Sequence, residues 1–129
     1  MPKKILIADD DKDIVLLIAS RLKANNFDVI VANDALQAFT KAIREKPDLI
    51  LLDIKMPAGG GIGVLENLRT SAETSIIPVI IITAFPSEEI LQKVKELRVS
   101  GFIAKPFKAD DLLRKIRKAL GEVSKGEGS

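Results

Sequence analysis

The chain of 129 residues contains no cysteine, histidine, tryptophan or tyrosine. Without cysteine it forms no disulfide, and without histidine it has no histidine general base, no Ser-His triad and no zinc site built on His and Cys. No apolar run approaches the roughly 20 residues of a membrane-spanning helix, and no signal peptide precedes the first apolar segment. A formal net charge of +2 is too small to indicate nucleic acid binding. We therefore expect a cytoplasmic protein that binds neither membrane nor nucleic acid.

Two kinds of apolar segment alternate along the chain. The short kind is rich in Ile, Leu and Val and predicts five strands, at 4–8, 28–32, 48–53, 78–83 and 101–104. These segments are almost continuously apolar, which is typical of parallel strands that are covered on both faces. Between and after them, apolar residues recur at helical spacing and predict five helices. The pattern predicts an α/β domain with a doubly wound, five-stranded parallel sheet.

We expect this domain to span residues 1–121. The small, polar segment 122–129 is interpreted as a flexible tail or linker stub. Asp34 and Ser87 stand where helix N-caps are expected. The stripe predicted to be buried in the first helix consists of Ile14, Leu17, Ile18 and Leu22.

Binding sites of open parallel sheets form beyond the carboxyl ends of the strands. The first predicted strand leads to Asp9 and Asp10, and the third, fourth and fifth lead to Asp53, Thr83 and Lys105. Two like charges about 4 Å apart repel by roughly 4 kcal/mol at an effective dielectric constant near 20, so three carboxylates should hold protons or bind a cation. Oxygen ligands alone favour Mg²⁺ or Mn²⁺. A carboxylate beside such an ion can attack a phosphoryl group.

A simpler interpretation of these acids is that they cap helices. It applies at least as well to Asp11 and Asp13, because a helix is predicted to begin there. It applies less well to Asp53, since no helix is predicted before about residue 61.

Four segments resemble, in family order, the receiver domains of two-component response regulators of the CheY-like kind. ILIADDD is similar to their acidic-pair segment, LILLDIKMP to the phosphoacceptor segment, VIIITA to the switch-threonine segment and AKPF to the lysine segment. The resemblance runs from about residue 3 to residue 120. It implies a flavodoxin-like fold with strand order 2-1-3-4-5, in a signalling domain that catalyses only its own phosphorylation and dephosphorylation.

The resemblance assigns the acidic residues to a phosphoacceptor and metal site. Asp53 would accept a phosphoryl group from the phosphohistidine of a sensor histidine kinase or a histidine phosphotransfer protein. Asp10, Asp53 and the backbone carbonyl of Lys55 would bind Mg²⁺, with Mn²⁺ as an alternative, and Asp9 would bind the ion through a water molecule.

The resemblance also implies a switch. Lys105 would pair with a phosphoryl oxygen, Thr83 would turn its hydroxyl toward the phosphoryl group, and Phe102 would turn inward behind it. The Lys105–Pro106 bond would be cis, although only about 5–6% of X-Pro bonds are cis. A downstream protein would bind the face formed by the fourth helix, the fifth strand and the fifth helix, with the residues Glu89, Lys93, Phe102, Lys108 and Arg114.

Lys55 and Phe85 lie two residues after Asp53 and Thr83, at positions that flank the phosphoryl group in this family. We expect both to obstruct an attacking water, and so to give a long-lived phosphoryl state. Three alternatives remain. They are a degenerate receiver that binds partners without phosphorylation, a Mg²⁺-dependent phosphatase, which usually carries an acid where Lys55 stands, and a nucleotide-binding domain, which lacks its G-x-G-x-x-G motif here.

Overall fold

The computed structural model describes residues 2–55, 60–84 and 87–122. The strands are β1 (Lys4–Ala8), β2 (Asp28–Ala32), β3 (Leu49–Asp53), β4 (Val79–Thr83) and β5 (Gly101–Ala104). The helices are α1 (Lys12–Ala24), α2 (Ala35–Glu45), α3 (Gly60–Thr70), α4 (Glu88–Glu96) and α5 (Ala109–Ala119). In the part of the chain that the structure describes, no helix has the length and apolar character needed to span a bilayer.

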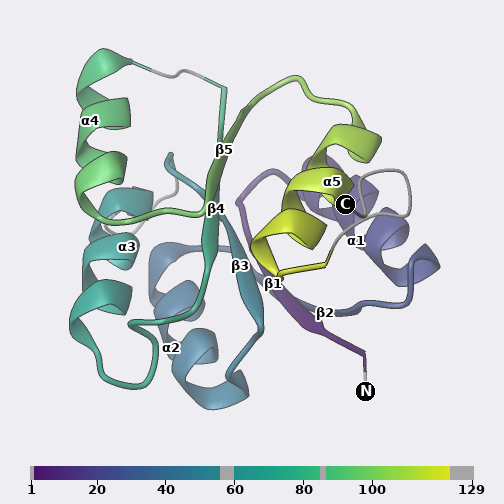
Figure 1. Ribbon diagram of the computed structural model, residues 1–129, viewed down its shortest axis with the longest axis horizontal. Helices are drawn as coiled ribbons and strands as arrows, with labels where there is room; N and C mark the ends of the chain where they lie inside the picture. The colour runs from purple at the N-terminus through teal and green to yellow at the C-terminus, as the bar shows by residue number, and fades with distance from the viewer. Residues whose placement is uncertain (1, 56–59, 85–86, 123–129) are drawn as a thin grey trace.

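The five strands form one parallel sheet, as the apolar pattern predicts, in the order β2-β1-β3-β4-β5 that the resemblance implies. Helices cover both faces: α1 and α5 lie on one side of the sheet, and α2, α3 and α4 lie on the other (Figure 1). The chain winds outward from β1 to β2 in one direction and from β1 through β3 to β5 in the other. The order of the strands therefore reverses between β1 and β3, where a site is expected in folds of this type.

The strands are apolar because both of their faces are buried. Every residue of β3 and β4 is buried. Alternate residues of each strand contribute to the two core layers: Ile50 and Leu52 pack on the side of α2 and α3, and Leu49 and Leu51 on the side of α1 and α5. Among the described residues, the buried polar ones are Asp9, Asp53, Thr74 and Thr83, and all of these except Thr74 lie at the end of a strand.

Side chains cap the helices where the sequence predicts caps, and at one further position. The Asp34 side chain accepts a hydrogen bond from the Gln37 N–H, and the Ser87 hydroxyl oxygen accepts one from Ile90. Asp11 caps α1 by accepting from the N–H groups of Asp13 and Ile14, at 3.0 and 3.3 Å. Helix capping therefore accounts for Asp11, the first of the two acids for which it was considered.

The predicted buried stripe of α1 is wrong for Leu17. Its side chain is 49% exposed, and that of Leu16 is 68% exposed. The buried residues of α1 are Val15, Ile18, Ala19 and Leu22. An unbroken run of six apolar residues, 14–19, does not define the phase of a helix, and in the folded chain the contact with the sheet selects the face that begins at Val15.

Arg69 joins three segments on the α3 side of the sheet. Its guanidinium donates to the carbonyl oxygens of Ser75 and Ile77, which precede β4, at 3.2 and 3.0 Å. It also donates to those of Leu97 and Arg98, at the end of α4, at 2.9 and 3.2 Å. Burial, with the nearby Arg98 cation, lowers the pKa of Arg69. The planar fork of five donors suits this role, because it serves several acceptors in fixed directions.

We predict that Arg69→Lys destabilises the fold, because an ammonium group cannot reach all four carbonyl oxygens. Partly buried acceptors without partners cost about 1–3 kcal/mol each, so we expect a loss of about 2–4 kcal/mol in the free energy of unfolding. Urea denaturation followed by circular dichroism measures it. Arg44→Lys, at an exposed position near the end of α2, is the matched control. Equal stability of the two variants would contradict the role of Arg69.

Candidate functional site

One edge of the sheet carries the polar residues that the sequence places at strand ends. Asp53 and Thr83 are the last residues of β3 and β4, Asp9 directly follows β1, and Lys105 directly follows β5. Asp9, Asp53 and Thr83 are 1%, 5% and 0% exposed, whereas Asp10 is exposed. Because all strands are parallel and in register, their carboxyl ends meet at the same edge.

Lys105 brings its charge to two of these carboxylates. Its Nζ lies 2.9 Å from Asp9 Oδ2 and 3.5 Å from Asp53 Oδ2. Burial alone would lower the pKa of Lys105, but the neighbouring Asp9 and Asp53 carboxylates outweigh it and raise the pKa. The ammonium group therefore stays charged and offsets part of the repulsion between the two acids.

Asp9 has one well-bonded oxygen and one that is less well satisfied. Oδ1 accepts a hydrogen bond from the Asp11 N–H at 2.9 Å. Oδ2 is buried and lies beside the ammonium group of Lys105, but in an orientation that gives it no hydrogen bond within the described residues. Burial raises the pKa of Asp9, and the Asp53 charge adds to the effect, while the Asp11 N–H and Lys105 only partly oppose it. The carboxylate form of Asp9 thus lacks part of its stabilisation.

The acidic cluster fits a divalent cation. Asp9, Asp10 and Asp53 each offer a carboxylate oxygen, and these oxygens lie within 4.8 Å of one another. The donors are all hard oxygen atoms, as Mg²⁺ and Mn²⁺ prefer, and the buried Asp9 Oδ2, which lies beside Lys105, gains a second positive charge if a cation lies among them. The prediction that Asp9, Asp10 and Asp53 share a site is consistent with this geometry.

Three aspartates of this region fold back on the chain in the same way. Asp9, Asp11 and Asp53 each accept a hydrogen bond from the N–H two residues further on, and for Asp53 Oδ1 the donor is Lys55 N at 3.1 Å. This Asx-turn geometry fixes the direction of each carboxylate. These turns were not predicted, although consecutive aspartates after a strand are the kind of pattern that favours them.

Thr83 and Phe102 lie on the same face of the sheet. Ile81 pairs with Phe102 and belongs to the core layer of α2, α3 and α4; Thr83 is two residues further along β4 and so points to the same side. Phe102 is half-buried against that layer.

The Lys105–Pro106 bond is cis, as the resemblance implies. Lys55 is exposed, and Phe85 lies outside the described residues. The switch and dephosphorylation roles of these residues stay predictions.

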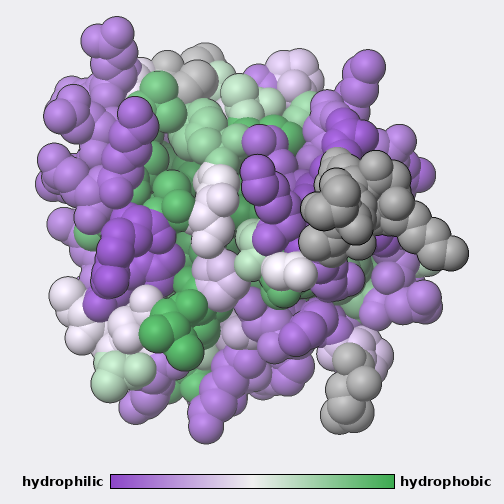
Figure 2. Space-filling model, viewed as in Figure 1, coloured by the Kyte–Doolittle hydropathy of each residue, from purple (hydrophilic) through white to green (hydrophobic). Residues whose placement is uncertain are grey.

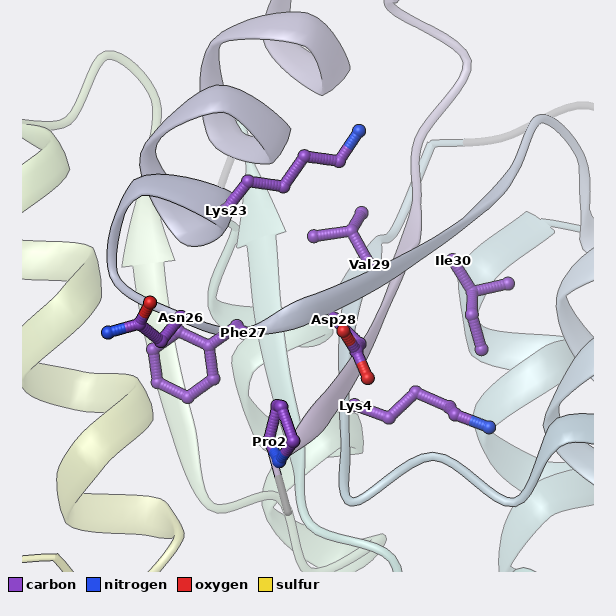
Figure 3. Close-up of a pocket in the computed structure, with 8 residues that line it drawn as sticks. All are labelled: Pro2, Lys4, Lys23, Asn26, Phe27, Asp28, Val29 and Ile30. Carbon is purple, nitrogen blue, oxygen red and sulfur yellow. The ribbon is translucent and has the colours of Figure 1, made fainter.

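A separate hollow of about 680 Å³ lies at the opposite end of the sheet. Lys4 and Asp28, the first residues of β1 and β2, line it together with Lys23, Asn26 and Phe27 at the end of α1 (Figure 3). Because Asp9 and Asp53 follow or end their strands, a strand length separates the hollow from the acidic cluster. It therefore plays no part in the chemistry of that cluster.

Comparison with known proteins assigns the family. Residues 5–117 match the response regulator receiver domain. The chain is 36% identical over 120 residues to sporulation initiation phosphotransferase F of Bacillus subtilis. This match covers 93% of this chain and 95% of that protein. It is 37% identical over 122 residues to the alkaline phosphatase synthesis transcriptional regulatory protein PhoP of the same organism, and this match covers 93% of the chain but spans only about half (49%) of PhoP.

Among solved structures, a CheY-like response regulator receiver domain protein of Methanospirillum hungatei superposes with a TM-score of 0.89 at 30% identity. This match covers 94% of this chain and 95% of that one. The chain belongs to the response regulator receiver domain family. Members of this family are signalling modules of two-component systems, bind Mg²⁺ at their acidic site and interact with histidine kinases or phosphotransfer proteins.

We predict that Mg²⁺ stabilises the fold in a pH-dependent way. A ligand that binds only the folded state adds about 2.7 kcal/mol when its concentration is about 100 times Kd. The pKa of Asp9 is raised on folding, so the neutral carboxyl stabilises the metal-free fold at low pH, and this contribution is lost as pH rises through the folded-state pKa. Protons thus compete with Mg²⁺ at a higher pH than for an ordinary aspartate. The rise in Tm caused by Mg²⁺ should be smaller at pH 5 than at pH 7.5.

Thermal unfolding followed by circular dichroism measures this effect, with NaCl at matched ionic strength as the salt control. Asp13→Asn removes an exposed acid outside the cluster and should keep the full Mg²⁺ effect, whereas Asp10→Asn should reduce it. An equal rise in Tm at both pH values would contradict the competition between protons and Mg²⁺ at Asp9.

Proposed function

We propose that this domain accepts a phosphoryl group on Asp53 from a phosphohistidine and, once phosphorylated, changes a protein-binding surface. One observation carries the proposal: the nearly buried Asp53 carboxylate lies in an acidic cluster, with Oδ2 3.5 Å from the ammonium group of Lys105. The chain's membership of the response regulator receiver domain family supports the same reaction.

The proposed reaction transfers a phosphoryl group between two side chains. An oxygen of Asp53 attacks phosphorus, an O–P bond forms, and the N–P bond of the phosphohistidine breaks. The imidazole nitrogen keeps the electron pair of that bond. Lys105 is placed to pair with a phosphoryl oxygen, because its Nζ already lies near the attacking carboxylate. The N–H of Lys55 binds Asp53 Oδ1, and the other oxygen, Oδ2, faces Lys105 and is the one proposed to attack.

Asp10, Asp53 and the backbone carbonyl of Lys55 would hold Mg²⁺, with Asp9 contributing through a water molecule. When bound, the ion supplies positive charge that offsets the carboxylates and the phosphoryl oxygens. Among the chain's own groups, Lys105 adds a fixed charge on the β5 side of the site.

The proposed output surface is formed by α4, β5 and α5. Hydrophilic residues cover α4 and α5 on this side of the molecule, and between the two helices lie hydrophobic residues beside α4 and near-neutral ones along the middle (Figure 2). Glu89, Lys93, Lys108 and Arg114 are exposed here, and Phe102 is half-buried on β5. Phe102 shares its sheet face with Thr83, so a movement of the threonine at the phosphoryl group can be passed to this surface through packing.

We predict that incubation with acetyl phosphate and Mg²⁺ adds one phosphoryl group to the wild-type chain, and that Asp53→Asn removes this adduct completely. Intact mass spectrometry measures it. Asp28→Asn, an exposed acid at the amino end of β2, should keep full phosphorylation. The absence of any adduct on the folded wild-type protein would favour the alternative, a degenerate receiver that binds its partner without phosphorylation.

We further propose that the phosphoryl state is long-lived. The exposed Lys55 directly follows the Asx turn of Asp53, so its side chain begins beside the attacking carboxylate, where it can hinder the approach of water. Phe85 is assigned the same role from the sequence alone. We predict that Lys55→Asn and Phe85→Ala each accelerate loss of the phosphoryl group in Mg²⁺, followed by intact mass over time. Decay of the wild-type adduct within seconds, or unchanged decay in both variants, would sink this proposal.

A further inference from the structure

The first turn of α3 contacts the backbone that carries Asp53. Gly61, the second residue of α3, donates its N–H to the carbonyl oxygen of Ile54 at 2.8 Å. A Cβ atom added to Gly61 would lie 2.3 Å from the carbonyl oxygen of Asp53, 2.6 Å from Ile54 Cα and 3.0 Å from the carbonyl carbon of Asp53. All three are backbone atoms, so none can move aside as a flexible side chain does.

The position of Asp53 depends on the same backbone. Asp53 Oδ1 accepts a hydrogen bond from the N–H of Lys55, so a shift of the segment 53–55 moves the carboxylate with it. On the sheet side, Ile54 N donates to Ile82 O at 3.4 Å, which is long for a hydrogen bond. The Ile54 side chain is buried, with 6% exposure. Ile54, the residue after β3, is thus bonded more closely to Gly61 of α3 than to Ile82 of β4.

We propose that Gly61 is a positioning residue for Asp53: its lack of a side chain allows α3 to press against the phosphoacceptor backbone and so sets the carboxylate relative to Lys105, Asp9 and Asp10. To reach the 3.4 Å of an ordinary contact from 2.3 Å, an added methyl group must displace this backbone by about 1 Å. A misplacement of about 1 Å at a reacting group can cost about 100-fold in rate. The expected loss of phosphorylation rate rests on the proposed function, whereas the expected shift of the Asp53 carboxylate does not.

The chain provides a matched control in the same helix. An added Cβ at Gly63 meets nothing within 4 Å. Gly63→Ala is therefore the same substitution in α3 without the contact, and it favours the helix, since alanine is the better helix former. The double variant Gly61→Ala/Gly63→Ala recovers helix stability without relieving the contact. Arg69→Lys, at the other end of α3, is a destabilised control that leaves the acidic cluster untouched.

Three measurements test the proposal on folded protein, with stability checked by urea denaturation. The first is the phosphorylation rate at saturating acetyl phosphate, corrected for the folded fraction; we expect it to fall about 100-fold in Gly61→Ala and in the double variant. The second is the Mg²⁺ affinity by calorimetry, which should fall in the same two variants. The third is the NMR shift of the Lys55 amide proton, which reports directly on its bond to Asp53 Oδ1. Gly63→Ala and Arg69→Lys should leave all three unchanged.

A wild-type rate, Mg²⁺ affinity and Lys55 amide shift in Gly61→Ala would overturn the proposal. So would equal losses in Arg69→Lys, because the effect would then follow stability and not position. If the wild-type chain accepts no phosphoryl group, the proposed function fails, but the Mg²⁺ affinity and the Lys55 amide shift still decide the role of Gly61.

Discussion

Repulsion among three carboxylates at one edge of the sheet is the constraint on which the site depends. The strands are apolar on both faces, so their polar residues stand only at their first or last positions, and the acids of this site gather at the carboxyl edge. Lys105 forms ion pairs with two acids of this cluster, Asp9 and Asp53, which it reaches from the end of β5. The acids come from the ends of only two strands, β1 and β3, whereas the lysine that offsets their charge comes from the end of β5. The sheet must therefore be complete from β1 to β5 before this lysine lies beside them.

Most of the fold could be predicted from the sequence, because burial on both faces makes each strand a continuous apolar run. The strands β1, β2 and β5 begin and end where predicted; β3 and β4 each begin one residue later. Asp48 is left out of β3, and its carboxylate instead accepts from the Lys4 N–H at 2.7 Å. Pro78 has no N–H to pair in the ladder. Leu17 could not be placed, because the apolar run 14–19 is compatible with more than one helix phase.

The site divides into what strand ends can predict and what only the folded chain shows. Asp9, Asp53 and Lys105 follow from the carboxyl ends of parallel strands, and the structure brings them together. The contact of Gly61 with Asp53 could not be foreseen, since it depends on how closely the start of α3 returns to the end of β3. The local sequence pattern shows which residues lie at the carboxyl edge of the sheet. How closely two backbone segments approach each other depends instead on the course of the loop that joins them.

The strand order also has a consequence for synthesis. Because β1 pairs with β2 on one side and β3 on the other, and β4 and β5 then add in turn, every new strand joins an edge that already exists. The sheet can therefore grow in the order in which the ribosome releases the chain, and no early strand has to open to admit a later one. If the sheet grows in this order, the acids that follow β1 and end β3 come together before Lys105 emerges, and the repulsion between them is not yet offset by its charge.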